Sequence, residues 1–135
     1  MGLLTGSRPS KLGLVNGQLH PLKSNSQNSV SSFAETDAHK IAPINASPNP
    51  RQTFMRLAEA VKATAGATLV KQDGNYIHAE FQTPLLKFTD DVEFLLDEGN
   101  AVIHVRSASR LGVRDFGVNR KRIELLREAI KTKLG

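Results

Sequence analysis

The sequence predicts an α+β fold in which two helices cover one face of a four-stranded antiparallel sheet, in the order α-β-β-β-β-α. Polar and apolar residues alternate in four segments between residues 67 and 109, which is the periodicity of strands. Turn residues divide these segments into two hairpins, with Asp73-Gly74 in the first and residues 97–100 in the second. Apolar residues recur with helical spacing on either side, in residues 50–65 and 119–134. Packing both helices on one face of the sheet is the economical arrangement of these elements.

The first helix is predicted to begin at Asn49-Pro50, because asparagine is a good N-cap and proline suits the first helical turn. Gly66 can end it in the left-handed conformation. Two hairpins are then expected, over residues 67–82 and 88–109. Thr83-Pro84 separates them, because proline cannot donate a hydrogen bond to a strand ladder.

Asp90 breaks the apolar pattern of the second hairpin. It is in phase with Val92 and Phe94, so we predict that it is a structural buried carboxylate that faces the helices. A buried carboxylate without a partner costs several kcal/mol, so it needs one. The possible partners are Arg106, Arg110, Arg120, Ser107 and backbone amides of residues 110–119. We expect Ser107, Arg110 or the loop amides.

The other face of the sheet has no predicted helix and is rich in ionisable groups. By strand parity it carries Tyr76, His78, Glu80, Asp91, Glu93, His104 and Arg106. The expected arrangement is a solvated face of cross-strand ion pairs, on which Asp91 is exposed. Two alternatives stay open: a pocket closed by the N-terminal residues, and a metal site of histidine and carboxylate ligands. We assign no metal and no cofactor.

The last helix starts with several basic side chains. Asn119 is expected to cap it, after a loop over residues 110–118. The arginines of its first turn either hold an anion at the helix N-terminus or pair with acidic side chains, and pairing is favoured. The acidic candidates are Asp90, Asp91, Glu93 and Asp115.

The N-terminal third differs in composition from the rest of the chain. Ser, Asn, Pro and Gly make up 22 of the first 50 residues, against 12 of the other 85. Such a segment buries too little apolar surface to fold alone. We therefore expect residues 1–48 to form an extended, partly docked arm and residues 49–135 to form a compact α+β domain.

The net charge and the cysteine content limit which partners and which cellular compartment are expected for the protein. The net charge is +5, but a block of −6 over residues 73–98 precedes a block of +6 over residues 106–135. The two blocks can neutralise each other within the fold, so nucleic-acid binding is not expected. The sequence has no cysteine, no apolar run long enough to span a bilayer and no secretory signal at its start. A cytoplasmic protein is expected, and the sequence assigns no oligomeric state.

Several blocks of sequence resemble the signature of the domain of unknown function 1499 family. These blocks are DDVEF (90–94), RSASR (106–110) and GVNRKRIELLR (117–127), with RPSKLGLVNGQL (8–19), NSVSS (28–32) and HKIAPI (39–44) before them. The resemblance implies a single compact domain and carries no established activity. Family members commonly have a cysteine pair near the NSVSS block, where this chain has Leu22 and Ser29. A role for those cysteines therefore does not apply here.

Three classes of function follow from these residues. The first is a non-catalytic binding or accessory protein for an anionic small molecule or a protein partner. The second is an enzyme that uses Asp, Glu, Arg and His for acid–base chemistry, and the third is a structural interaction module. A serine hydrolase is not expected, because strand alternation sends His104 and Ser107 to opposite faces. The candidate ligand-binding residues are Asp91, Glu93, Arg106, Ser107, Ser109, Arg110, Asp115, Asn119 and Arg120.

Overall fold

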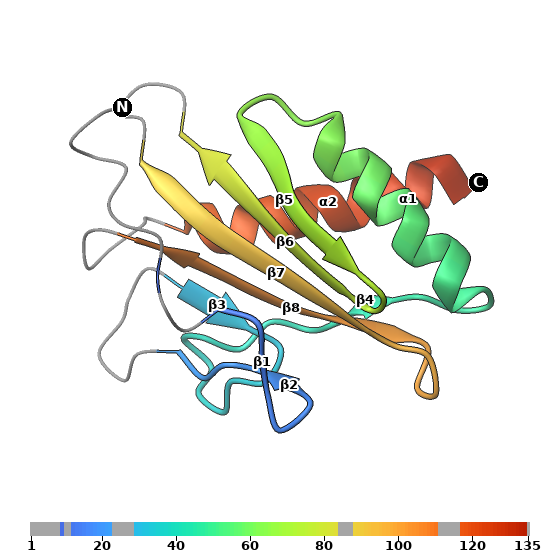
Figure 1. Ribbon diagram of the computed structural model, residues 1–135, viewed down its shortest axis with the longest axis horizontal. Coiled ribbons are helices and arrows are strands. Elements are labelled where there is room, and N and C mark those ends of the chain that lie inside the picture. The colour runs from blue at the N-terminus through green and yellow to red at the C-terminus, as the bar shows by residue number, and fades with distance from the viewer. Residues whose placement is uncertain (1–8, 10–11, 23–28, 84–87, 111–116, 135) are drawn as a thin grey trace.

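Two helices and an antiparallel sheet form the protein, as the computed structural model shows (Figure 1). The structure describes residues 9, 12–22, 29–83, 88–110 and 117–134, with the side chains of the last helix described to residue 131. The helices are α1 (Pro50–Lys62) and α2 (Val118–Leu134). The four longest strands are β5 (Ala67–Asp73), β6 (Tyr76–Gln82), β7 (Thr89–Asp97) and β8 (Val102–Ser109). The predicted α+β class and the order of these six elements are confirmed.

The prediction of a four-stranded sheet is wrong, because the sheet has six strands. Two short strands, β3 (Ser29–Ser31) and β4 (Ile44–Asn45), both pair with β8 along the edge that faces away from β7. A separate two-stranded hairpin joins β1 (Leu14–Val15) to β2 (Gln18–Leu19). Strands of two or three residues are too short to show a period-two pattern, so the sequence periodicity did not reveal them.

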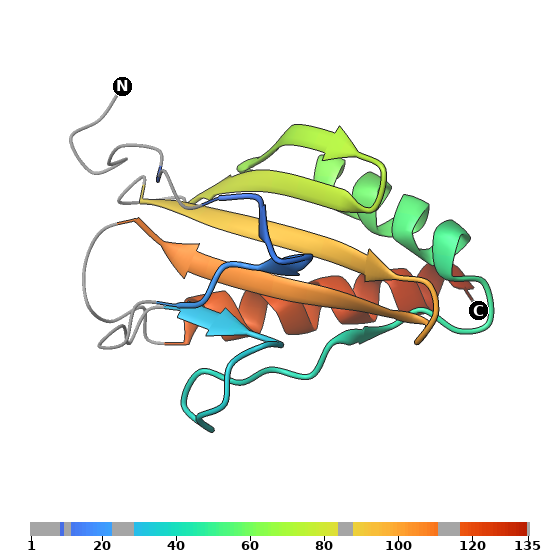
Figure 2. The ribbon, with the colours of Figure 1, turned by 60° about the horizontal axis from the view of Figure 1, so that its bottom comes forward.

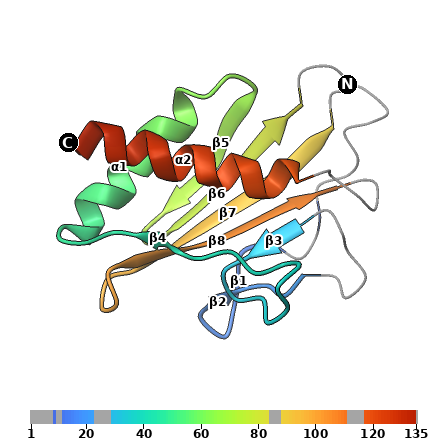
Figure 3. The ribbon, with the colours of Figure 1, turned by 180° about the vertical axis from the view of Figure 1, so that it is seen from behind.

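The two helices cover one face of the sheet, and the β1–β2 hairpin lies over the other (Figures 2 and 3). Asn49 precedes α1 as predicted, but its side chain makes no capping hydrogen bond. α1 ends at Lys62, and Gly66 serves the turn into β5 with a φ of +82°. A Cβ at Gly66 would lie 2.7 Å from the carbonyl oxygen of Gln82, so this turn requires glycine.

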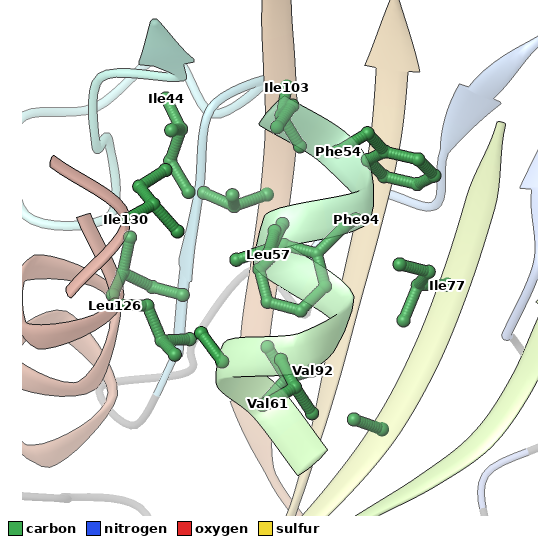
Figure 4. Packing of buried hydrophobic residues seen from close by; sticks show 14 of the residues in the cluster. Ile44, Phe54, Leu57, Val61, Ile77, Val92, Phe94, Ile103, Leu126 and Ile130 are labelled. Carbon is green, nitrogen blue, oxygen red and sulfur yellow. The ribbon is translucent and has the colours of Figure 1, made fainter. Parts of the chain in front are cut away.

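A single apolar core fills the space between the sheet and the helices (Figure 4). β7 contributes Val92 and Phe94 to it from the centre of the sheet. The two helices and the flanking strands supply the facing side chains, which include Phe54, Leu57, Val61, Ile77, Ile103, Leu126 and Ile130. In the described residues, no helix is long and apolar enough to cross a membrane.

Residues 29–46 belong to this core and to the sheet. Val30, Ile41, Ile44 and Ala46 are buried in the same cluster as the side chains of α1 and β7. Arg127 of α2 donates hydrogen bonds to the main-chain carbonyls of residues 42 and 43, at 2.8 Å each. This segment therefore packs against α2 as well as against β8.

Replacement of Ile44 by alanine tests how strongly this segment is integrated. Ile44 is 1% exposed, so Ile44→Ala should lower the free energy of unfolding by about 2–5 kcal/mol through lost burial and a cavity. Leu125→Ala is the matched control, because Leu125 is 66% exposed and should change stability by less than about 0.5 kcal/mol. Both values come from urea denaturation. Equally small losses in the free energy of unfolding for the two variants would show that residues 29–46 contribute little to the stability of the domain.

Candidate functional site

The central strand β7 carries acidic side chains on both faces of the sheet. Asp90 points toward the helices, in phase with Val92 and Phe94, while Asp91 and Glu93 point to the opposite face. All three carboxylates are buried, although two of them lie on the face that has no helix. The candidate site therefore includes side chains on both faces of β7.

Asp90 forms an ion pair with the last helix. Its Oδ2 accepts a hydrogen bond of 2.7 Å from Nη2 of Arg122, and Asp90 is 1% exposed. Arg122 was not among the partners expected for Asp90, but this contact matches the favoured alternative in which arginines of the first helical turn pair with acids. The Arg122 guanidinium also lies 4.9 Å above the centre of the Phe81 ring.

Three further side chains extend this ion pair into a hydrogen-bond network. Ser107 donates to Oδ1 of Asn119 at 2.6 Å, and the Asn119 amide donates to Ser109 at 3.0 Å. Arg122 donates to Ser107 and to Asn119, at 3.2 and 2.8 Å. We call these five residues, Asp90, Ser107, Ser109, Asn119 and Arg122, the polar junction. The predicted capping role of Asn119 is wrong: α2 begins one residue earlier, and the Asn119 side chain turns toward β8.

One polar atom of the junction is left without a partner. Oδ1 of Asp90 is buried and accepts no hydrogen bond from any residue that the structure describes. It is also the only buried side-chain nitrogen or oxygen in this condition among the described residues. A buried acceptor without a donor costs about 1–3 kcal/mol, and more when it is charged. The described residues of the junction therefore leave one acceptor of Asp90 without a donor.

A second cluster lies on the opposite face of the same strand end. Asp91 accepts hydrogen bonds from Arg110 at 2.8 and 3.0 Å and shares one with Nε2 of His78 at 2.8 Å. Arg110 also donates to Glu80 at 2.5 Å. We call His78, Glu80, Asp91 and Arg110 the open-face cluster. The expectation that Asp91 is exposed is wrong, since its exposed fraction is 1%.

The hydrogen bonds of this cluster keep its charges fixed. Burial alone would raise the pKa of Asp91, but hydrogen bonds from His78 and Arg110 outweigh it and lower that pKa below its ordinary value. The hydrogen bond to Asp91 in turn raises the pKa of the Arg110 guanidinium, against the opposing effect of burial. Both groups are therefore charged throughout the neutral range.

The structure also brings together the residues of the metal-site alternative. The ligand atoms of His78, Glu80 and Asp91 lie within 4.8 Å of one another. The Arg110 guanidinium, however, hydrogen-bonds to both carboxylates of this set. A positive charge from the chain itself thus stands where a metal ion would have to bind.

Of the remaining candidate residues, Glu93, Arg106 and Arg120 belong to neither of these two clusters. Glu93 and Arg106 pair with each other at 3.4 Å, and main-chain groups of Gly13 and His20 contact them. Arg120 donates to the main-chain carbonyls of Lys40 and Ala38. Asp115 lies outside the described residues. His104 and Ser107 do lie on opposite faces of β8, so these two residues do not form the nucleophile–base pair of a serine hydrolase.

A family model described as a protein of unknown function (DUF1499) matches residues 21–130. The chain belongs to the DUF1499 family. The three signature blocks of this DUF1499 chain meet at one end of the sheet: the junction takes Asp90 from the first block, Ser107 and Ser109 from the second, and Asn119 and Arg122 from the third. Neither a curated protein nor a solved structure matches the chain.

Sequence reasoning counted Arg122 only among the first-turn arginines that could pair with acids, although a more specific signal was present in this DUF1499 chain. Arg122 follows Asn119 by three residues, so both side chains lie on the same face of α2. A helix face that presents Asn119 to β8 must also present Arg122 to it. The burial of Asp90 then selects Arg122 over the exposed Lys121.

Replacement of Asp91 by asparagine should have a pH-dependent effect on stability. Because the folded-state pKa of Asp91 is depressed, its charge stabilises the fold above the unfolded pKa of about 3.9 and stops doing so as pH falls through the folded pKa. Asp91→Asn should therefore cost about 2–4 kcal/mol at pH 7 and progressively less below about pH 4.

Urea denaturation at a series of pH values measures this difference in free energy of unfolding. Asp73→Asn is the control, because Asp73 is exposed and should change stability by less than about 0.5 kcal/mol. A loss for Asp91→Asn that is small at pH 7, or that does not vary with pH, would contradict the fixed charge of Asp91.

Proposed function

We propose that this DUF1499 protein is a non-catalytic binding protein whose ligand site is the polar junction. The observation that carries the proposal is Oδ1 of Asp90, which has no hydrogen-bond partner among the described residues although the neighbouring Ser107, Asn119 and Arg122 are hydrogen-bonded. A ligand that donates one hydrogen bond to this oxygen offsets a cost that the free protein bears. The meeting of the three signature blocks at this place supports the same choice.

The charges at the junction favour a ligand with an N–H or O–H donor over a simple anion. Arg122 already donates to Asp90, Ser107 and Asn119. An anion would have to displace a chain carboxylate from the guanidinium and would approach the Asp90 charge. A small molecule with an amide, hydroxyl or ammonium donor meets no such competition, so we assign this class of ligand to the site.

Acid–base catalysis has less support than binding. A catalytic acid or base works best when its pKa lies near the operating pH, and it must be free to exchange a proton with the substrate. The hydrogen bonds around Asp91 lower its pKa instead, and those around Arg110 raise the pKa of that group. These groups are thus suited to holding a fixed geometry.

A thermal-shift panel tests the proposed function. The panel contains amino acids, nucleosides, amines and sugars as donor ligands, with phosphate, sulfate and citrate as anionic comparisons. A ligand at a hundredfold excess over its Kd stabilises a protein by about 2.7 kcal/mol, which raises the melting temperature by several degrees in a chain of this size. We expect at least one donor ligand to do so.

Titration calorimetry then locates the binding of that ligand. Asp90→Asn should weaken it by roughly tenfold or more, since the amide group replaces a charged acceptor. Asp97→Asn is the matched control in the same strand, because Asp97 is partly exposed and lies near the other end of β7. Circular dichroism establishes that both variants are folded. Equal affinities for the two variants, or stabilisation by the anions alone, would refute the proposal.

A further inference from the structure

Three polar side chains are buried on the open face, beside the open-face cluster and on the opposite side of the sheet from the polar junction. The Tyr76 hydroxyl donates to Oε2 of Glu93 at 2.5 Å, and Arg106 donates to Oε1 of Glu93 at 3.4 Å. We call Tyr76, Glu93 and Arg106 the covered trio. Burial, reinforced by the neighbouring Glu93 carboxylate, raises the pKa of Tyr76 far above its usual range, so its hydroxyl stays a donor.

Main-chain groups of residues 13–21 complete the hydrogen bonds of this trio. The N–H of Gly13 donates to Oε2 of Glu93 at 2.7 Å. The Arg106 guanidinium donates to the carbonyl oxygens of His20, at 2.9 Å, and of Pro21, at 3.4 Å. A carboxylate thus accepts from a backbone N–H while a guanidinium donates to backbone carbonyls, which are contacts that any peptide can make.

One side chain of the hairpin supplies the specific contact. Leu19 is 2% exposed and packs with Tyr76, Leu95 and Phe33. Leu14 of the paired strand is 46% exposed and takes no part in this cluster. The open face of the sheet therefore contacts the main chain of residues 13–21 and the side chain of one leucine in that segment.

The β1–β2 hairpin lies over the covered trio but has few buried side chains of its own. Leu19 is the only buried residue of the four in β1 and β2. A buried ion pair is often no more stabilising than apolar residues of the same size, because desolvation offsets the attraction between the charges. Stability alone therefore does not account for a glutamate, an arginine and a tyrosine under such a cover. Binding does, because peptide-binding proteins combine main-chain hydrogen bonds with pockets for particular side chains.

We propose that the covered trio, with Leu95 and Phe33, is a peptide-binding site that residues 13–21 occupy within the chain. Its partner ligand is a hairpin-forming segment of another protein that carries a leucine at the position of Leu19. Such a segment replaces the β1–β2 hairpin, offers an N–H to Glu93 and offers carbonyls to Arg106. This site lies on the face of the sheet opposite the polar junction. A result that refutes this proposal therefore leaves the proposed function untouched, and the reverse also holds.

Release of the hairpin in the full-length chain tests this site. The probe is a fluorescein-labelled peptide of residues 12–22, and its binding is followed by fluorescence anisotropy. In the wild-type chain the peptide competes with the attached hairpin, which raises its apparent Kd by the inverse of the open fraction. Leu19→Ala in the chain removes the buried contact of the hairpin, so the labelled peptide should bind roughly tenfold tighter or more.

Leu14→Ala is the matched control in the chain, because Leu14 belongs to the same hairpin and is exposed; it should bind the peptide as the wild type does. A peptide that itself carries Leu19→Ala should bind the Leu19→Ala chain roughly tenfold more weakly than the unchanged peptide. Gly13→Pro provides a second way to open the site. It removes the N–H that donates to Glu93, and proline cannot adopt the φ of +90° found at this position.

Circular dichroism shows which of the opened chains are folded, and anisotropy is measured on those. Peptide binding no tighter to the opened chains than to the wild type would overturn the proposal, as would equal binding of the unchanged and Leu19→Ala peptides. Exchange of the hairpin between two copies would appear in light scattering as a concentration-dependent dimer. That result would overturn the assignment of the ligand to a partner protein.

Discussion

The buried ion pair between Asp90 and Arg122 is the interaction on which the arrangement of the polar junction depends. It joins the central strand of the sheet to α2 at the edge of the apolar core, where 11% of the Arg122 side chain and 2% of the Asp90 side chain are exposed. An unpaired charge there would cost several kcal/mol, so the contact fixes the start of α2 against β7 and β8. Asn119, three residues before Arg122, is thereby brought to Ser107 and Ser109. The same geometry leaves Oδ1 of Asp90 directed at no donor among the described residues.

Ion pairing with arginines recurs along β7. Three of the four acids of this strand pair with arginines from different parts of the chain: Asp90 with Arg122, Asp91 with Arg110, and Glu93 with Arg106. The fourth, Asp97, lies 3.5 Å from His104. Three arginines of the basic block thus pair with three acids of the acidic block inside the fold. These three guanidinium groups are directed inward to carboxylates.

The long elements of the fold could be predicted from the sequence, and the short ones could not. Strands β5 to β8 and both helices each repeat their period several times, so their existence is clear from polarity alone. β3 and β4 have two or three residues, and only pairing with β8 defines them. The sequence does contain a signal for the β1–β2 hairpin, the Asn16-Gly17 pair, because Asn-Gly favours tight hairpin turns. Both residues have the positive φ that such a turn requires.

The burial of the site residues was harder to predict than their side of the sheet. Strand parity placed Asp90 toward the helices and Asp91 and Glu93 away from them, as the register shows. Parity says nothing, however, about what covers a face. Glu93 is buried because a hairpin some 80 residues away in sequence lies over it, and Asp91 because Arg110 returns from the end of β8. Such contacts between distant segments leave no trace in local periodicity.

A double-mutant cycle between Asp90 and Arg122 tests the central ion pair most directly. Asp90→Ala and Arg122→Met should each lower the free energy of unfolding by about 3–5 kcal/mol, because each leaves one buried charge unpaired, while methionine keeps a contact with Phe81. The double variant should recover about 2–3 kcal/mol of the summed loss, which is the coupling expected for a buried pair. Losses that add to within about 0.5 kcal/mol would show that the two residues act independently and would contradict this account.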